Sequence, residues 1–181
     1  MPARKRAIRT RVEYNSELVW TQLTVPLFVD IVETKIVSGD EFIGYVQQHG
    51  IAAIEISRQE KQQLQQQWRA VFAFSLRTRT GRRKSSDRDW HVFSTKQTVC
   101  RTGTTALNLY LQTKTPDFFI VPADEDLPGL RCTGDTPPDL SSLQLDLYIS
   151  PPDFTWTMVF THEPLWHGPY FARREWQKIK L

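Results

Sequence analysis

The chain has 181 residues, of which 40% are apolar and 12% are aromatic, and this is enough for one domain with a well-packed core. No run approaches the roughly 18 apolar residues of a membrane-spanning helix, and no apolar stretch of signal-peptide type follows the first residues. Cys100 and Cys132 are too few for a disulfide framework and lack the paired spacing of zinc ligands. We therefore expect a cytoplasmic protein with no membrane segment and no cofactor.

The formal net charge of +3 conceals an uneven distribution. Residues 1–11, 77–88 and 173–181 hold 15 of the 23 basic residues beside only two acidic ones, which leaves 8 basic against 18 acidic residues elsewhere. Basic segments attract phosphates, so nucleic-acid binding is one hypothesis, although terminal and loop cations also simply keep proteins soluble. No aromatic residue lies among the loop cations to stack on bases. The cations concerned are Arg4, Lys5, Arg6, Arg82, Arg83 and Lys84.

The chain is divided by composition into an arm, a domain and a tail. Residues 1–38 are interpreted as a basic arm with possible edge strands, because residues 19–37 mix β-branched and aromatic side chains around Pro26. We expect a single globular domain over residues 39–174. A basic tail is expected over residues 175–181.

The domain is predicted to begin with a helix from Ser38 to about His49 that ends at Gly50, followed by a short strand over 51–56. A longer helix is predicted over 58–76, with its glutamines on the solvated face. The evidence for this helix is a capping box made by Ser57 and Glu60 and an apolar stripe of Leu64, Trp68, Val71, Phe72 and Phe74.

Helices and strands alternate after the basic loop, residues 77–88. Residues 90–94 are predicted as a strand, 102–112 as a helix and 117–121 as a buried strand, and a loop with three acidic residues then spans about 123–140. This alternation predicts an α/β or α+β fold, with a mixed sheet and helices packed on it.

A C-terminal antiparallel hairpin is the clearest strand signal. Apolar residues occupy every second position over 143–149 and again over 154–160, separated by the loop 150–153. The alternation places these apolar residues on one core face and leaves a polar opposite face around Asp146. The predicted pairs are Ile149 with Phe154, Leu147 with Trp156, and Leu145 with Met158.

Several sequence blocks carry a family resemblance. They are WHVFS at 90–94, DLYI at 146–149, FTWTMV at 154–159, THE at 161–163 and GPYF at 168–171. Together they resemble the bacterial family named domain of unknown function 4275, over roughly residues 45–174. The resemblance implies a small bacterial α/β domain and supplies no established activity.

The segment after the hairpin contains the best candidates for chemistry. A zinc-protease helix needs two histidines one turn apart, whereas His162 and His167 are five apart and Pro164 interrupts any helix, so this motif is rejected. A looser metal site of His162 and His167 with His91 or Asp146 stays open, but no metal is expected because no Cys or acidic partner has a recognisable spacing. Acid–base catalysis stays open, with His162 as base, His91 as a second acid, and Asp146 or Glu163 as orienter. The two neighbours His162 and Glu163 are not expected to touch if the strand continues through them, since adjacent strand residues point to opposite faces.

The favoured hypothesis is a non-catalytic binding module of accessory, inhibitor or immunity type, with another protein as partner. One alternative is a small hydrolase or nuclease-like enzyme built on His162 and His91, and another is a nucleic-acid-binding accessory protein. A purely structural role for the turn also stays open. The binding residues proposed for the aromatic-rich turn and its surroundings are Trp166, Tyr170, Phe171, Trp90 and His167.

Overall fold

The computed structural model describes residues 38–74, 88–163 and 168–180. All of them belong to Ile31–Leu181, the second of two units into which the chain divides, the first being Met1–Asp30. The predicted N-terminal arm and most of the predicted basic loop lie outside the described residues.

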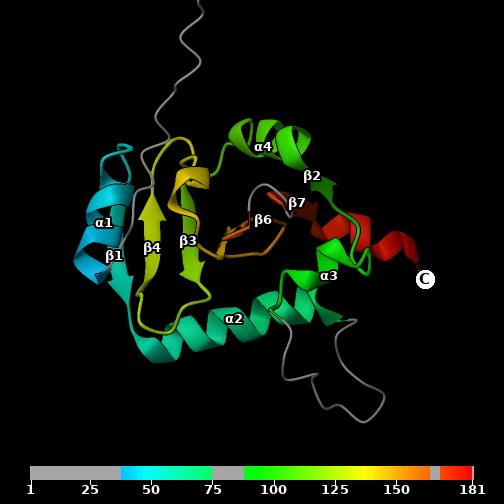
Figure 1. The fold of residues 1–181 in the computed structure, drawn as a ribbon, viewed down its shortest axis with the longest axis horizontal. Helices are drawn as coiled ribbons and strands as arrows, with labels where there is room; N and C mark the ends of the chain where they lie inside the picture. The colour runs from blue at the N-terminus through cyan, green and yellow to red at the C-terminus, as the bar shows by residue number, and fades with distance from the viewer. Residues whose placement is uncertain (1–37, 75–87, 164–167, 181) are drawn as a thin grey trace, which may run out of the picture. The chain divides into compact units, whose positions relative to one another are not determined.

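The described elements form one sheet with helices on both faces (Figure 1). The helices are α1 (Gly39–Gln47), α2 (Arg58–Phe72), α3 (His91–Ser94) and α4 (Gly103–Leu111), and the strands are β1 (Ala52–Ile56), β2 (Arg101–Thr102), β3 (Asp117–Pro122), β4 (Gly129–Thr133), β5 (Leu147–Ser150), β6 (Trp156–Phe160) and β7 (Tyr170–Arg173). The strand order is β1-β4-β3-β5-β6-β7-β2, with antiparallel neighbours throughout. Helices combined with an antiparallel sheet confirm the predicted α+β class.

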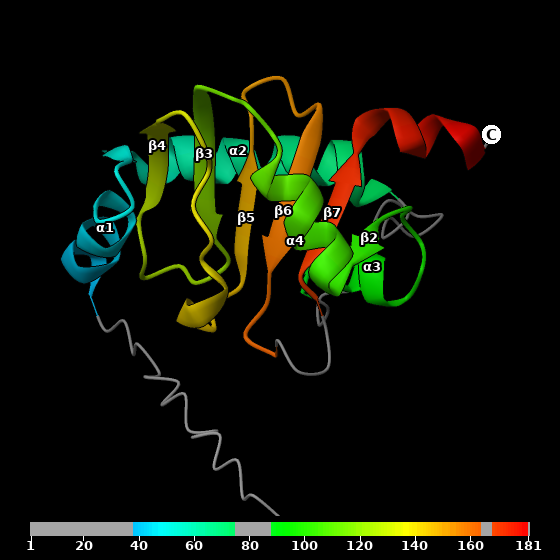
Figure 2. The same cartoon turned by 90° about the horizontal axis from the view of Figure 1, so that it is seen from above.

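Each face of the sheet has its own hydrophobic core (Figure 2). On the first core face, Phe42 of α1 and Tyr110 of α4 pack against the strands. On the second core face, α2 runs across the sheet and contributes Trp68. Neighbouring strand residues alternate between the two, as Tyr170 in the second core and Phe171 in the first core show. The sheet is therefore buried on both sides.

The hairpin of β5 and β6 is confirmed, but its predicted register is wrong. Leu147 pairs with Phe160 instead of Trp156, a shift of four residues, and residues 151–155 connect the strands. A shift by an even number keeps each side chain on the same face, because side chains alternate with a period of two. Apolar alternation alone could not distinguish these two registers.

The opposite face of the hairpin is buried, which corrects the predicted polar surface. Tyr148 and Val159 belong to the second core, and Thr157 is fully buried. The helix α2 covers this face, and Trp68 Nε1 donates a 2.8 Å hydrogen bond to Thr157 Oγ1, so the hydroxyl is satisfied within the core. Phe154, predicted on the first core face, also packs in the second core from a left-handed backbone with φ of 52°.

Residues 90–94 contain the short helix α3, so the strand predicted there is wrong. Trp90, Val92 and Phe93 are all buried in the second core. A strand would point Val92 and Phe93 to opposite faces, whereas one helical turn lets both reach the same core. Five residues are too few for their periodicity to distinguish the two conformations.

The loop predicted over 123–140 contains β4, which pairs with both β1 and β3. Its Leu130 and Cys132 are fully buried. At Gly129 an added Cβ would lie 2.9 Å from Ile56 Cδ1, so the glycine allows β1 and β4 to pack closely. The many Pro and Gly residues of this segment concealed the strand.

The aromatic-rich turn predicted over residues 161–171 is also corrected, because its last two residues belong to β7. This strand pairs with β6 on one side and β2 on the other. The predicted basic tail begins with a 3₁₀ helix, Arg174–Lys180, in which Trp176 packs edge-on against Phe171 with ring centroids 6.1 Å apart.

Two helix starts follow the predicted capping chemistry. Ser38 and Glu41 form a reciprocal capping box at α1. At α2, Ser57 accepts from the backbone N–H of Glu60 at 3.1 Å, but the Glu60 carboxylate pairs with Arg131 of β4 at 2.6 Å. The capping box predicted for α2 is thus half formed.

Candidate functional site: a charged pocket at one end of the sheet

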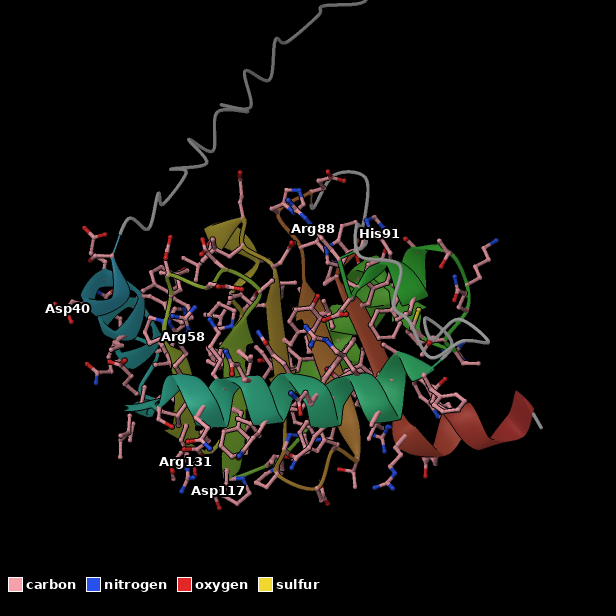
Figure 3. The ribbon with its side chains drawn as sticks, turned by 90° about the horizontal axis from the view of Figure 1, so that it is seen from below. Asp40, Arg58, Arg88, His91, Asp117 and Arg131 are labelled. Atoms are coloured by element: carbon pink, nitrogen blue, oxygen red, sulfur yellow. The ribbon has the colours of Figure 1, made fainter. Side chains whose placement is uncertain are left out.

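The hairpin brings two predicted site residues to the same end of the sheet. Asp146 directly precedes β5 and His162 follows β6, and the pairing of Leu147 with Phe160 makes these two strand ends neighbours. Arg88, the last residue of the predicted basic segment, reaches the same place from the start of α3. Figure 3 shows Arg88 at this end and Asp117 at the far end of the sheet.

Asp146 is the centre of the site. Its side chain is only 8% exposed, and Oδ1 accepts from the backbone N–H of His162 at 3.0 Å and from His162 Nδ1 at 2.8 Å. The other oxygen, Oδ2, accepts from Arg88 Nη1 at 2.9 Å. Three donors thus compensate one nearly buried carboxylate, as burial of a charge requires.

His162 lies between charged groups. Its Nε2 is 3.2 Å from Glu163 Oε1, so the prediction that the two side chains would point apart is wrong. The physical reason is that β6 ends at Phe160, and the residues after it no longer alternate. Arg88 Nη1 also lies against this ring, 2.5 and 2.6 Å from its two nitrogens.

These residues line a surface pocket of about 460 Å³. The Arg88 side chain is 50% exposed, and within the described residues its Nε and Nη2 make no hydrogen bond. Asp124, on the loop after β3, is also exposed and has no ion pair with any residue in the described ranges. The lining residues are Arg88, Ala123, Asp124, Gln144, Leu145, Asp146 and His162.

A buried layer supports the pocket from below. Tyr148 accepts a 3.2 Å hydrogen bond from the backbone N–H of Trp90, which fixes the start of α3 just after Arg88. Burial raises the pKa of the Tyr148 hydroxyl well above its ordinary value, and the charges of Asp89 and Asp146 add to the effect. Tyr148 is therefore a neutral structural group at physiological pH.

The loop that carries Asp124 is held by a buried lysine that the sequence interpretation missed. Lys61 Nζ donates to the backbone carbonyls of Asp124 and Leu127, at 2.5 and 2.7 Å. Burial lowers the pKa of Lys61, and the nearby carboxylates of Asp124 and Glu125 partly oppose this. The helical spacing was the available signal, because Lys61 lies three residues before Leu64, on the buried stripe of α2.

The remaining predicted site residues are distributed differently. His91 packs on Trp90 with centroids 4.0 Å apart and bonds Ser94 at 3.3 Å, and within the described chain it has no hydrogen bond to His162. Trp90, Tyr170 and Phe171 are at most 4% exposed, so their rings belong to the cores and not to a docking surface. The predicted residues that lie outside the described ranges are Arg4, Lys5, Arg6, Arg82, Arg83, Lys84, Trp166 and His167.

Two other features, a metal cluster and a membrane-spanning helix, are absent from the described residues. No group of three or more His, Cys, Asp or Glu side chains in residues 38–74, 88–163 and 168–180 could hold a metal ion. No helix in the same part of the chain is long and apolar enough to cross a membrane.

Comparison with known proteins identifies the family. The family model described as Domain of unknown function (DUF4275) matches residues 41–171. The chain belongs to the DUF4275 family. The charged pocket lies inside the DUF4275 region, since its lining residues run from 88 to 162. No curated protein and no solved structure matches the chain.

Proposed function

We propose that the chain is a non-catalytic binding protein whose ligand site is the charged pocket beside Asp146 and His162. The observation that carries this proposal is the state of Arg88. Its Nη1 is fixed by Asp146, while Nε and Nη2 have no hydrogen-bond partner in the described residues and the side chain is half exposed. A guanidinium held in place with donors to spare suits recognition of a carboxylate or phosphate group.

The surroundings favour binding over catalysis. Both nitrogens of His162 have a carboxylate within 3.2 Å, so neither is open to a substrate proton, as a general base requires. The described lining of the pocket includes no hydroxyl or thiol side chain as nucleophile. The pocket volume of about 460 Å³ is within the range typical of small-ligand sites.

A thermal-shift panel tests this proposal. Small carboxylates, phosphate, amines and amino acids are each added to the full chain and to Arg88→Gln. We expect at least one compound to raise the unfolding temperature of the wild type, because a ligand of the native state stabilises it by mass action, and to lose this effect in Arg88→Gln. Compounds that stabilise both proteins equally would contradict the proposal.

Acid–base catalysis by His162 is the second candidate, and the 2.8 Å bond from Nδ1 to Asp146 favours it. Asp146 would orient the ring, and the 45% exposed Glu163 would have to move away from Nε2. Hydrolysis of p-nitrophenyl acetate or phosphate by the wild type and its loss in His162→Gln would support this candidate. Equal rates in both proteins would remove it.

The proposal retains three expectations from the sequence. These are a bacterial source, a cytoplasmic location and a protein partner, which would bind at a surface other than the pocket. The absence of a Cys100–Cys132 disulfide is compatible with a reducing compartment. Nucleic-acid binding through the basic segments, and a partner contact through Trp166, stay predictions that concern residues outside the described ranges.

A further inference from the structure

We propose that the charged pocket takes a free α-amino acid, whose carboxylate binds Arg88 and whose ammonium group binds Asp124. This inference rests on the proposed function, because it names the ligand class of the same pocket. It follows from the two charged groups of the lining that have binding capacity left.

The anion-binding side of the pocket is Arg88. Nη1 of this side chain donates to Asp146, so the edge formed by Nε and Nη2 is left to bind a ligand. That edge presents two parallel N–H donors, the arrangement that a planar carboxylate accepts with both oxygens. The Asp146 side chain is 8% exposed and already accepts three hydrogen bonds, so its carboxylate is not available to a ligand.

The cation-binding side is Asp124. Its Oδ1 accepts the backbone N–H of Asp126 at 2.9 Å, which orients the carboxylate. The nearby ammonium group of Lys61 attracts this carboxylate but donates to the Asp124 backbone carbonyl, and the carboxylate forms no ion pair with any described residue. Lys61 holds the Asp124 backbone from the buried side and leaves the side chain exposed. A fixed carboxylate at the rim of a pocket is an acceptor for an ammonium group.

The charge balance selects a zwitterion. Asp146 is already bonded to Arg88 and His162, so the charged groups of the lining left for a ligand are the Nε and Nη2 edge of Arg88 and the carboxylate of Asp124. A simple anion would leave Asp124 without a counter-ion, and a simple cation would leave that edge of Arg88 without an acceptor. A molecule with a carboxylate and an ammonium group a few bonds apart satisfies both ends, and the pocket volume of about 460 Å³ holds a molecule of amino-acid size.

Three matched probes test the inference by calorimetric titration of the full chain. L-Alanine carries both charges, propionate lacks the ammonium group, and ethylamine lacks the carboxylate. We expect alanine to bind at least about tenfold more tightly than either analogue, since each charge-assisted contact contributes a tenfold factor or more. Propionate binding as tight as that of alanine would overturn the inference and leave the proposed function intact. Failure of all three probes would also overturn the inference, whereas the proposed function fails only if no compound of the thermal-shift panel, phosphate included, acts through Arg88.

Variants of Asp124 and Arg88 test which residue binds the ammonium group and which binds the carboxylate. Asp124→Asn should weaken alanine about tenfold and leave propionate unchanged, and Asp126→Asn, on the same loop but outside the pocket lining, should change neither. Arg88→Gln should abolish the binding of both probes. Arg88→Lys provides a second variant that keeps the charge at Asp146 but loses the two-donor edge, so we expect it to weaken both probes. An Asp124→Asn protein that binds alanine normally would refute the assignment.

Discussion

Replacing Asp146 with Asn perturbs the charged pocket with the smallest change of shape. The carboxylate accepts three hydrogen bonds within 3.0 Å, two of them from Arg88 and the His162 ring. Asn keeps an oxygen for the backbone N–H of His162, but its amide has no charge to hold the other two donors. Charge-assisted hydrogen bonds contribute about 1.5–3 kcal/mol each, and water replaces part of this because Arg88 and His162 are partly exposed. We therefore expect a loss of about 2–3 kcal/mol in the free energy of unfolding.

Urea denaturation of the wild type and Asp146→Asn at neutral pH measures this loss. Asp124→Asn is the matched control, since that carboxylate is exposed and its one backbone bond survives in Asn, and we expect it to cost less than about 0.5 kcal/mol. A double-mutant cycle between Asp146→Asn and His162→Ala should show coupling of about 1 kcal/mol. A cost for Asp146→Asn below about 0.5 kcal/mol, or no coupling to His162, would refute the view that Asp146 organises the site.

Three further predictions concern the scaffold. Lys61→Met should lower the free energy of unfolding by about 2 kcal/mol, because two backbone carbonyls lose a charged donor. The control is Gln62→Met at an exposed neighbour, and equal effects of the two variants in urea denaturation would contradict this prediction. Burial raises the pKa of the Cys132 thiol from 9.0 to about 12, so above pH 9 the folded chain holds more protons than the unfolded chain and its stability falls, by about 1 kcal/mol at pH 10. Urea titrations at pH 7 and 10 should show a smaller loss in Cys132→Ala, and an identical loss would count against this cause. Gly129→Ala should cost about 1–3 kcal/mol in thermal unfolding through its clash with Ile56, and Ile56→Val should recover part of that cost; no recovery would remove the clash as the cause.

Local signals in the sequence predicted most of the elements because their causes are local. The capping serines placed the starts of α1 and α2, and the alternation over 143–160 placed the β5–β6 hairpin on the correct faces apart from Phe154. The register was predicted wrongly because an even shift leaves the alternation unchanged. The second face of the hairpin was predicted as polar and exposed because α2, which covers it, is distant in the sequence, and no local pattern reveals that contact.

The candidate site was predictable in part for the same reason. His162 and Asp146 were recognised by residue type, but the predicted register placed Asp146 opposite Thr157, and only the observed pairing of Leu147 with Phe160 brings it beside His162. Arg88 was grouped with its basic neighbours, since only the tertiary fold separates it from them and carries it to Asp146. Tyr170 and Phe171 were misplaced as surface residues, because aromatic side chains suit both an interface and a core.

The central claim is that the charged pocket is where the chain meets its ligand. A ¹⁵N NMR titration of the full chain with L-alanine, propionate and phosphate tests it most directly, because shifted amide signals locate the bound molecule. We expect the signals of Gln144, Asp146 and His162 to shift together with one affinity for at least one probe, and to stay unchanged in Arg88→Gln. Shifts that gather on another surface, or that persist in Arg88→Gln, would contradict the account.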